Sequence, residues 1–549
     1  MNEVELLPTM TMDQAAEAVI AAYADREAIV AGDRHLTYAE FGAGINAVAG
    51  GLVALGIQKG DRVATILPNS PEFLFFFFGT GKAGAVHVPL SPLLRENELV
   101  HILNESEAKV IVLVPNAWNS DILGLVTRLL PALPSVRQLV VVGDSAPEGA
   151  ITLDAFLAAG HAHPLAESRS KPEDLYGLIY TSGATGVPKA VMHSHRTMLA
   201  APILLQRAEH AKKPLTDTFK MIRTVAKHRD RYGKWGREQV TMLCAMPYQA
   251  LAGYQPMLTA LLNGRRLVVM ERFHPVLAMR LIQEHHVNTV AVTPTMGRLM
   301  LDVPDFVTYD VSSVLTFAYG AALTPLELAE ETSVKFDCPV IIGFGATETG
   351  GAAAVTKFYE SGSAGVLDSI GKPLAGVEIK LVDEEGKPVP DGQVGEVVVR
   401  TAGNMLGYYK RPEETAAVMD ADGFMHVGDL AIRDRHGYYK IVGRKKDVII
   451  RGGQNVYPAE VEGILAQHPA VQQAAVVGVP DEVGGEAVWA YVVLNPGETL
   501  TTSQLVGYCS ERIAPYKLPT EVRFVSELPL TASGKVRKPT LVEMALAEK

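Results

Sequence analysis

A loop flanked by two short apolar runs constrains the fold and chemistry of this chain most strongly. Residues 177–197 read GLIYTSGATGVPKAVMHSHRT, and the apolar runs 178–180 and 190–192 predict a strand on each side of the loop. The loop contains the hydroxyl residues Thr181, Ser182 and Thr185, the glycines Gly183 and Gly186, and Lys189. Glycines let backbone N–H groups converge on an anion, hydroxyls add donors and a lysine adds charge. The stretch therefore predicts a polyphosphate site, with a plain surface turn as the alternative.

This stretch resembles the phosphate-loop signature of the adenylate-forming superfamily, which includes acyl-CoA synthetases, luciferase and the adenylation domains of peptide synthetases. The usual form is Y-T-S-G-T-T-G-x-P-K-G, and this chain departs from it at Ala184 and Ala190. It is not a Walker loop, because Val187 and Pro188 precede the lysine and no Gly-Lys-Ser/Thr opens a helix. The resemblance implies that the loop residues bind ATP.

Length, charge and cysteine content bound the class of protein. A chain of 549 residues is too long for one hydrophobic core, so we expect two or more domains. The net charge of −11 argues against nucleic acid as a partner. The acidic N-terminus does not resemble a signal peptide and no stretch suits a membrane span, so we expect a cytoplasmic protein with at most peripheral membrane contact. Cys244, Cys338 and Cys509 are odd in number and far apart in the sequence, which suits reduced thiols. A homodimer is compatible with the sequence.

The order of apolar segments predicts an α/β fold. Between residues 36 and 142, apolar strands alternate with amphipathic helices, which is typical of a doubly wound, mostly parallel sheet, and the phenylalanines at 73–78 predict a buried helix. Short strands bounded by Gly or Pro recur over residues 239–344. Residues 371–400 predict a β-rich subdomain, and residues 438–453 predict a second hairpin.

We therefore predict two domains. A large adenylating domain spans residues 1–445, with doubly wound sheets and the β-rich subdomain, and a small mobile α+β domain spans residues 446–549. The resemblance implies that Lys446 is the hinge.

Residues 198–238 carry ten basic and four acidic residues. Such a segment is typical of a solvated helical excursion. The sharper hypothesis is that it attracts coenzyme A phosphates, an acyl donor protein or a membrane surface.

A second motif, residues 343–348, resembles the family's Y-G-x-T-E motif with Phe344 in place of tyrosine. The resemblance implies that Thr347 binds phosphate oxygens and that Glu348 holds Mg²⁺, with Thr181 as a further ligand. Mg²⁺ prefers hard oxygen ligands and bridges phosphates through one or two carboxylates. The residues expected to surround the adenine are Gly320, Ala321, Ala322, Gly343 and Phe344, and Gly345 is expected to bind ATP beside them.

Three further family positions complete the expected nucleotide site. Asp429, in a stretch resembling T-G-D, is expected to accept from the ribose hydroxyls. Arg444 matches the arginine that contacts ribose and phosphate. Lys535, in P-L-T-A-S-G-K, matches the catalytic lysine, because an ammonium between carboxylate and α-phosphate stabilises the charge of the transition state.

The resemblance implies two reactions at one site. A carboxylic acid and ATP give acyl-AMP and pyrophosphate, and a thiol then attacks the acyl carbonyl and releases AMP. In the family, the small domain turns after the first step and replaces the lysine with a glycine hairpin that lines a pantetheine tunnel. Gly452 and Gly453 match that hairpin, which favours coenzyme A as the acceptor.

The expected acyl pocket lacks an acidic partner for an amino group, so amino acids are disfavoured. Ala250 stands where the family commonly has histidine, which leaves apolar space near the carboxylate. The residues expected to line the pocket are Tyr248, Ala250, Tyr319, Gly320, Phe344 and Ala346. We expect a medium- or long-chain fatty acid or an alicyclic or aryl acid as substrate. His195 is expected to be structural.

Three alternatives remain open beside an acid–thiol ligase. Within the superfamily, they are a luciferase-like monooxygenase and a fatty acyl-AMP ligase that loads a carrier protein. The third is a nucleotide-binding homologue without turnover, against which Lys535, Glu348 and Asp429 argue.

Overall fold

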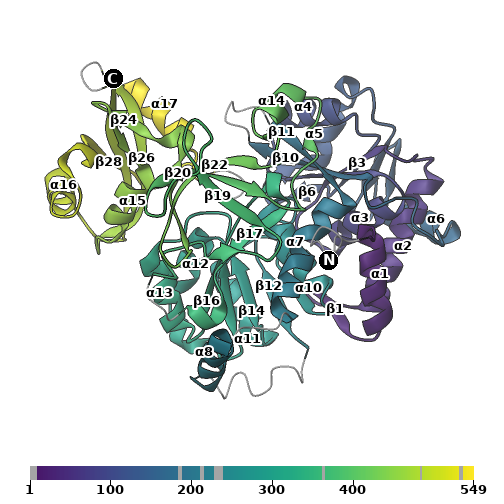
Figure 1. Ribbon diagram of the computed structural model, residues 1–549. Coiled ribbons are helices and arrows are strands. Elements are labelled where there is room, and N and C mark those ends of the chain that lie inside the picture. The colour runs from purple at the N-terminus through teal and green to yellow at the C-terminus, as the bar shows by residue number, and fades with distance from the viewer. Residues whose placement is uncertain are drawn as a thin grey trace.

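The computed structural model describes residues 9–182, 188–210, 215–227, 239–361, 365–481, 485–530 and 536–548. It has a large N-terminal part and a separate C-terminal part (Figure 1), which confirms the predicted α/β class. Among the described residues, no helix is both long enough and apolar enough to cross a bilayer.

The first sheet lies at the centre of the large part. Its strand order is β18 (Lys372–Pro373), β17 (Gly351–Val355), β16 (Val340–Ala346), β15 (Thr316–Tyr319), β14 (Thr289–Val292), β12 (Thr241–Cys244), β13 (Arg266–Val269), β1 (Glu27–Ala31) and β2 (Arg34–Thr37). The strands from β16 to β1 are parallel neighbours, and antiparallel strands close both edges. Its helices are α10 (Leu251–Leu261), α11 (Pro275–Glu284), α12 (Pro294–Leu301) and α13 (Leu326–Lys335).

The second sheet carries the hydroxyl-rich loop. Its strand order is β21 (Gly407–Tyr408), β11 (Pro188–Ser194), β10 (Leu175–Ser182), β4 (Val86–Leu90), β3 (Arg62–Ile66), β5 (Val110–Leu113), β8 (Gln138–Val141) and β9 (Ala150–Thr152). Strands β10 and β11 pair antiparallel with Thr181 opposite Lys189, which confirms the strands predicted on both sides of the loop. The loop residues 183–187, including Gly183, Thr185 and Gly186, lie outside the described residues.

The helices between residues 12 and 210 are α1 (Met12–Tyr23), α2 (Tyr38–Ala54), α3 (Pro71–Lys82), α4 (Glu96–Ser106), α5 (Ile122–Leu129), α6 (Leu153–Ala162) and α7 (His195–His210). A small hairpin of β6 (Asn116–Ala117) and β7 (Ser120–Asp121) lies in the same range. Helix α3 begins where Ser70 Oγ accepts from the N–H of Phe73 at 3.1 Å. The predicted burial of its phenylalanines is confirmed, because each is at most 8% exposed. A helix that is apolar all round belongs in a core.

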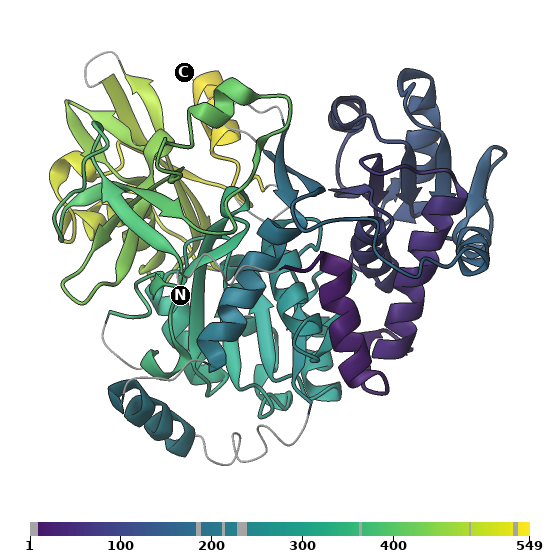
Figure 2. The same ribbon diagram turned by 45° about the vertical axis from the view of Figure 1, so that its right-hand side comes forward.

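Two smaller sheets follow. The third sheet has the order β19 (Glu378–Val382), β20 (Val394–Arg400), β22 (Met425–Arg433) and β23 (Tyr439–Arg444), which confirms the β-rich subdomain, and helix α14 (Pro412–Ala416) precedes β22. The C-terminal sheet contains β25 (Gln454–Val456), β24 (Ile449–Arg451), β27 (Gly485–Leu494), β26 (Val471–Asp481) and β28 (Glu521–Phe524), with helices α15 (Pro458–Ala466), α16 (Thr502–Ser510) and α17 (Lys538–Glu548). Figure 2 shows the two sheets side by side.

The hairpin predicted over residues 438–453 is wrong. Strand β23 pairs with β22 in the third sheet, whereas β24 pairs with β25 and β27 in the C-terminal sheet. A short 3₁₀ turn, η6 (Lys445–Asp447), connects them. The chain thus passes from one sheet to another here, and the predicted domain boundary at Lys446 falls in this connection.

Candidate functional site

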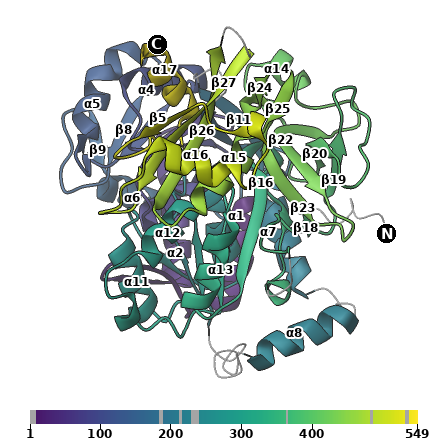
Figure 3. The same cartoon turned by 90° about the vertical axis from the view of Figure 1, so that its left-hand side faces the viewer.

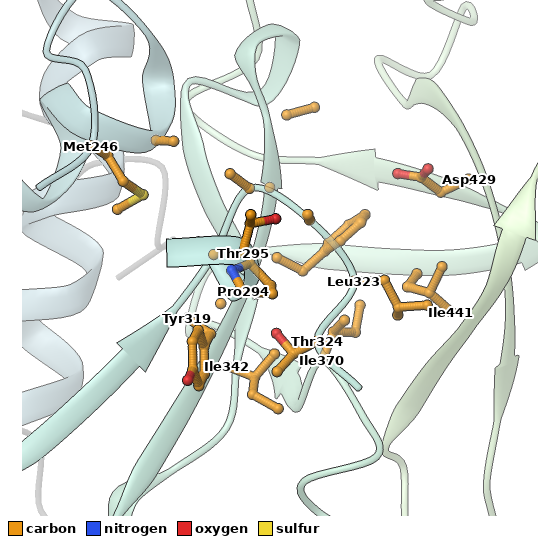
Figure 4. A pocket seen from close by; sticks show the side chains of 18 of the residues that line it. Met246, Pro294, Thr295, Tyr319, Leu323, Thr324, Ile342, Ile370, Asp429 and Ile441 are labelled. Carbon is orange, nitrogen blue, oxygen red and sulfur yellow. The ribbon is translucent and has the colours of Figure 1, made fainter. Parts of the chain in front are cut away.

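A cleft of about 3320 Å³ lies where the parallel strands of the first sheet end, between that sheet, the third sheet and the C-terminal part. Ligand sites of open α/β sheets form at such carboxyl ends. Figure 4 shows Met246 on one side of the pocket and Asp429 with Ile441 on the other, and Tyr319, which ends β15, lies between them. Residues from several of the sequence motifs line this one cleft.

The described ends of the hydroxyl-rich loop lie in the cleft wall. Thr181 and Lys189 both line it. The ammonium of Lys189 forms an ion pair with Glu414 of α14 and lies 5.5 Å from the ring centroid of Tyr408. Lys189 is the largest cause that holds the pKa of Glu414 below its usual value. Ser182 ends β10.

The turn that carries Thr347 and Glu348 follows β16 as a 3₁₀ turn, η4 (Thr347–Thr349), and both residues line the cleft. The hydroxyl of Tyr408 donates to Glu348 Oε1 at 2.9 Å. Burial, with the neighbouring Glu348 carboxylate, raises the pKa of Tyr408, so this hydroxyl keeps its proton. One carboxylate oxygen of Glu348 is therefore oriented by a neutral donor.

His193 fixes the same turn from the second sheet. Its Nε2–H donates to the backbone carbonyl of Thr347 at 2.7 Å, and its Nδ1 lies 3.0 Å from Thr197 Oγ1. Burial lowers the pKa of His193 to about 4, so the ring is neutral at physiological pH. The turn and the hydroxyl-rich loop are thereby tied to one strand, β11.

Strands β15 and β16 form a wall of small residues. Gly320, Ala321, Ala322, Gly343, Phe344, Gly345 and Ala346 all line the cleft. Ala321 has a φ of +71°, which is strained for a residue with a Cβ. At Gly345, a Cβ would lie 2.1 Å from the carbonyl oxygen of Gly351, so only glycine fits there.

Asp429 and Arg444 lie opposite each other on β22 and β23 and both line the cleft. Arg444 Nε lies 2.9 Å from Asp429 Oδ1, and the Asp429 side chain is 10% exposed. Next to them, Lys445 donates to Glu396 at 2.9 Å. Asp429, which is expected to bind the ribose, is thus paired with Arg444, which is expected to contact the ribose and the phosphate.

Segments of the C-terminal part close the cleft. Lys446, Leu530 and Val536 line it, and Leu530 forms an antiparallel bridge with Val536. Lys535 lies outside the described residues. Gly452 and Gly453 form the turn between β24 and β25, with φ of +58° and +78°, and stand outside the lining.

The acyl prediction fits the lining at five of its six positions. Ala250, Tyr319, Gly320, Phe344 and Ala346 line the cleft. Tyr248 does not, so its placement as a lining residue is corrected. Its backbone N–H donates to Asn69 Oδ1 at 2.8 Å and its ring packs 6.0 Å from that of Phe73, which turns the side chain into the core.

Sequence reasoning missed His193, Tyr408 and Glu414. His193 stands in the stretch 191–195, where an isolated histidine gives no signal of its partner, and the other two lie on a short strand and a short helix far from the motifs. His195, expected to be structural, is buried with its Nδ1 accepting from the N–H of Met12 at 3.0 Å.

Comparison with known proteins agrees with this arrangement. The AMP-binding enzyme family matches residues 16–409, and the C-terminal domain of AMP-binding enzymes matches residues 460–535. A methyl-dioxo-octahydro-indenyl-propanoyl:CoA ligase of Mycobacterium tuberculosis is 33% identical over 540 residues, which cover 97% of this chain and 99% of the relative. The medium-chain fatty-acid–CoA ligase of Escherichia coli is 32% identical over 94% of this chain and 87% of its own length.

A solved anthranilate CoA ligase with bound anthranoyl-AMP superposes with a TM-score of 0.84 at 27% identity and covers 100% of both chains. These matches confirm the resemblance stated from the sequence and the predicted enzyme class of acyl-CoA synthetases. The chain belongs to the family of AMP-binding enzymes.

Proposed function

We propose that this protein is an ATP-dependent acid–thiol ligase that converts a hydrophobic carboxylic acid to its coenzyme A thioester. The acid attacks the α-phosphate of ATP to give acyl-AMP and pyrophosphate, and the coenzyme A thiol then displaces AMP from the acyl carbon. The observation that carries the proposal is that Thr181, Glu348, Asp429 and Arg444 line one cleft together with Leu530 and Val536 of the C-terminal part.

In this proposal, the ribose lies against Asp429 and Arg444, and the phosphates lie between Thr181, Thr347 and Lys189. Ion pairing to Glu414 and packing over Tyr408 position Lys189 before ATP binds. The adenine lies against the small-residue wall of β15 and β16, where the glycines let a flat ring approach the backbone. The family resemblance predicts that Gly183, Thr185 and Gly186 also donate to the phosphates.

Mg²⁺ fits the donor set. Among the described residues, no group of three or more His, Cys, Asp or Glu side chains could hold a metal alone. A bound Mg²⁺ would keep several waters and take further ligands from the phosphates, so it needs only one or two carboxylates from the protein. Glu348, which Tyr408 orients, fits that role. When bound, Mg²⁺ supplies positive charge that offsets the charge of the phosphates.

Lys535 is proposed to stabilise the charge that develops during attack on the α-phosphate. Leu530 and Val536 are part of the lining while Gly452 and Gly453 stand outside it, which supports a role of the 530–536 segment in the adenylating step. The thioester step then requires a turn about Lys446 that exchanges the two segments.

The acyl group is proposed to be apolar. Met246, Ala250, Leu251 and Pro294 line the cleft beyond the small-residue wall, and apolar linings favour fatty, alicyclic or aryl acids. The named relatives act on an indenyl propanoate and on medium-chain fatty acids, and the superposed structure holds an aryl adenylate.

The test is to incubate the protein with ATP, Mg²⁺ and a panel of fatty, alicyclic and aryl acids, and to follow AMP release with and without coenzyme A. We expect AMP release that depends on both the acid and coenzyme A. AMP release that does not depend on coenzyme A supports carrier-protein loading instead, and the absence of AMP release with every acid contradicts catalysis altogether.

A further inference from the structure

Helix α8 (Leu215–Lys227) exposes an apolar stripe. Leu215, Phe219 and Ile222 are spaced by four and three residues, which puts them on one helix face, and their exposed fractions are 78%, 70% and 56%. Figure 3 shows the helix at the bottom of the molecule, beside the large part and far from the C-terminal sheet. Three large apolar side chains so exposed on adjacent turns indicate an interaction surface.

The opposite side of α8 is fixed to the protein. Asp217 accepts from Lys357 Nζ at 2.9 Å and from the hydroxyl of Tyr359 at 3.1 Å, and Lys220 lies 3.5 Å from Glu360. Lys357 holds the pKa of Asp217 below its usual value, so this anchor stays charged at neutral pH. The anchor sets the orientation of the helix and turns the stripe outward.

The same anchored side borders the cleft. Asp217 and Met221 are among the residues that line it. One face of α8 therefore borders the cleft, while another presents the stripe to solvent.

Charge identifies the class of surface that fits the stripe. The chain as a whole carries −11, yet residues 198–238 contain ten basic and four acidic residues. On α8, Arg223 lies exposed next to the stripe, whereas Lys220 pairs with Glu360 on the anchored side. Amphipathic helices with an apolar face and a basic flank bind the interface of anionic membranes, where both features contribute. Binding to nucleic acid would use the positive charge but not the apolar stripe.

We propose that α8 docks the protein on an anionic lipid surface. Leu215, Phe219 and Ile222 enter the interface, and Arg223 faces the headgroups. A lipid-soluble acid then reaches the cleft beside the docked helix without crossing bulk water. This inference rests on the surface of α8 and stands apart from the identity of the acid.

The experiment uses the full chain and sedimentation with vesicles of phosphatidylcholine alone or mixed with phosphatidylglycerol. We expect binding to the anionic vesicles, weakened by salt, and little binding to the neutral ones. The triple variant Leu215→Ser/Phe219→Ser/Ile222→Ser should bind anionic vesicles about tenfold or more weakly. Its turnover of a water-soluble acid should stay at the wild-type level.

The matched control is Val307→Ser/Val334→Ser, which removes two apolar side chains that are 92% and 79% exposed elsewhere. It should bind vesicles as the wild type does. A probe attached to Phe219→Cys should report an apolar environment only with anionic vesicles. The native cysteines Cys244, Cys338 and Cys509 are buried, so they should not compete for the label.

Three results overturn the proposal. They are no binding of the wild type to either vesicle, equal binding of wild type and triple variant, and a self-association of the wild type that the triple variant abolishes. The last result assigns the stripe to a second copy of the chain.

Discussion

The two halves of the cleft are built differently. In the nucleotide half, Glu348, Asp429 and Lys189 each have a polar partner within the protein, namely Tyr408, Arg444 and Glu414. In the acyl half, Met246, Ala250 and Leu251 line the cleft with apolar side chains. Polar partners fix direction, whereas apolar walls fix only size and shape. In the proposed function, the nucleotide half would therefore define the reaction, and the acyl half would define which acid is used.

The largest expected effect is on the nucleotide half. Lys535→Ala should lower acyl-adenylate formation by about 10²–10³ or more, because a preorganised cation no longer offsets the transition-state charge. The measurement is ATP–pyrophosphate exchange. Thioester formation from pre-made acyl-AMP should be much less affected, and Lys387→Ala, on an exposed turn, serves as the control. Exchange near the wild-type rate would show that Lys535 is misassigned.

Asp429→Asn should raise the KM for ATP roughly 10- to 100-fold, since a charge-assisted hydrogen bond to ribose is lost together with the pair to Arg444. The KM for the acid should change little, which separates the two halves. ATP titration at saturating acid measures both. An equal rise in both Michaelis constants contradicts the division.

Ala250→Trp tests the acyl half alone. The added ring fills apolar space, so kcat/KM for long or branched acids should fall about 10- to 100-fold, while short acids are retained. The KM for ATP should stay the same. A panel of acids of increasing length gives the measurement, and a uniform loss across the panel would place Ala250 outside the acyl subsite.

Tyr408→Phe should have a smaller effect. It removes the donor to Glu348 without removing the ring beneath Lys189, so we expect a loss of about five- to tenfold at limiting Mg²⁺. Excess Mg²⁺ should recover part of it. Turnover against Mg²⁺ concentration is the readout, and an unchanged Mg²⁺ dependence rejects the link between Tyr408 and the metal.

The smallest effect on turnover is expected for His193→Gln, which keeps a donor toward Thr347. The folded pKa of His193, about 4, lies below its unfolded value, so stability is full above about pH 6.5 and is lost as pH falls toward 4. Between pH 7 and pH 5 the variant should lose about 2 kcal/mol less unfolding free energy than the wild type. Denaturant unfolding at both pH values measures this, and equal losses contradict it.

The sequence predicted what depends on local pattern. The α/β class, the strands around the hydroxyl-rich loop and the buried phenylalanine helix follow from apolar periodicity, which neighbours along the chain impose. The same pattern does not choose strand partners, so β23 and β24 were wrongly paired although each strand was found.

Long-range contacts were beyond the sequence for the same reason. His193 meets Thr347 across 154 residues, and Tyr408 meets Glu348 across 60. No local signal ties such pairs, because β11 and β21 are neighbours in the second sheet while the η4 turn follows β16 of the first. The contacts of Tyr248 are also distant in sequence, since its N–H donates to Asn69 and its ring packs against Phe73.

The connection at η6 separates the residues proposed to bind the ribose from the C-terminal sheet. Asp429 and Arg444 belong to the third sheet, and the chain joins the C-terminal sheet only at Ile449. If the C-terminal part turns about Lys446 as proposed, a rotation confined to the residues between them would move the segment that carries Lys535 and would leave Asp429 and Arg444 in place. The AMP part of the adenylate would then stay bound to Asp429 and Arg444 while pyrophosphate leaves and coenzyme A enters, so AMP should be the last product released.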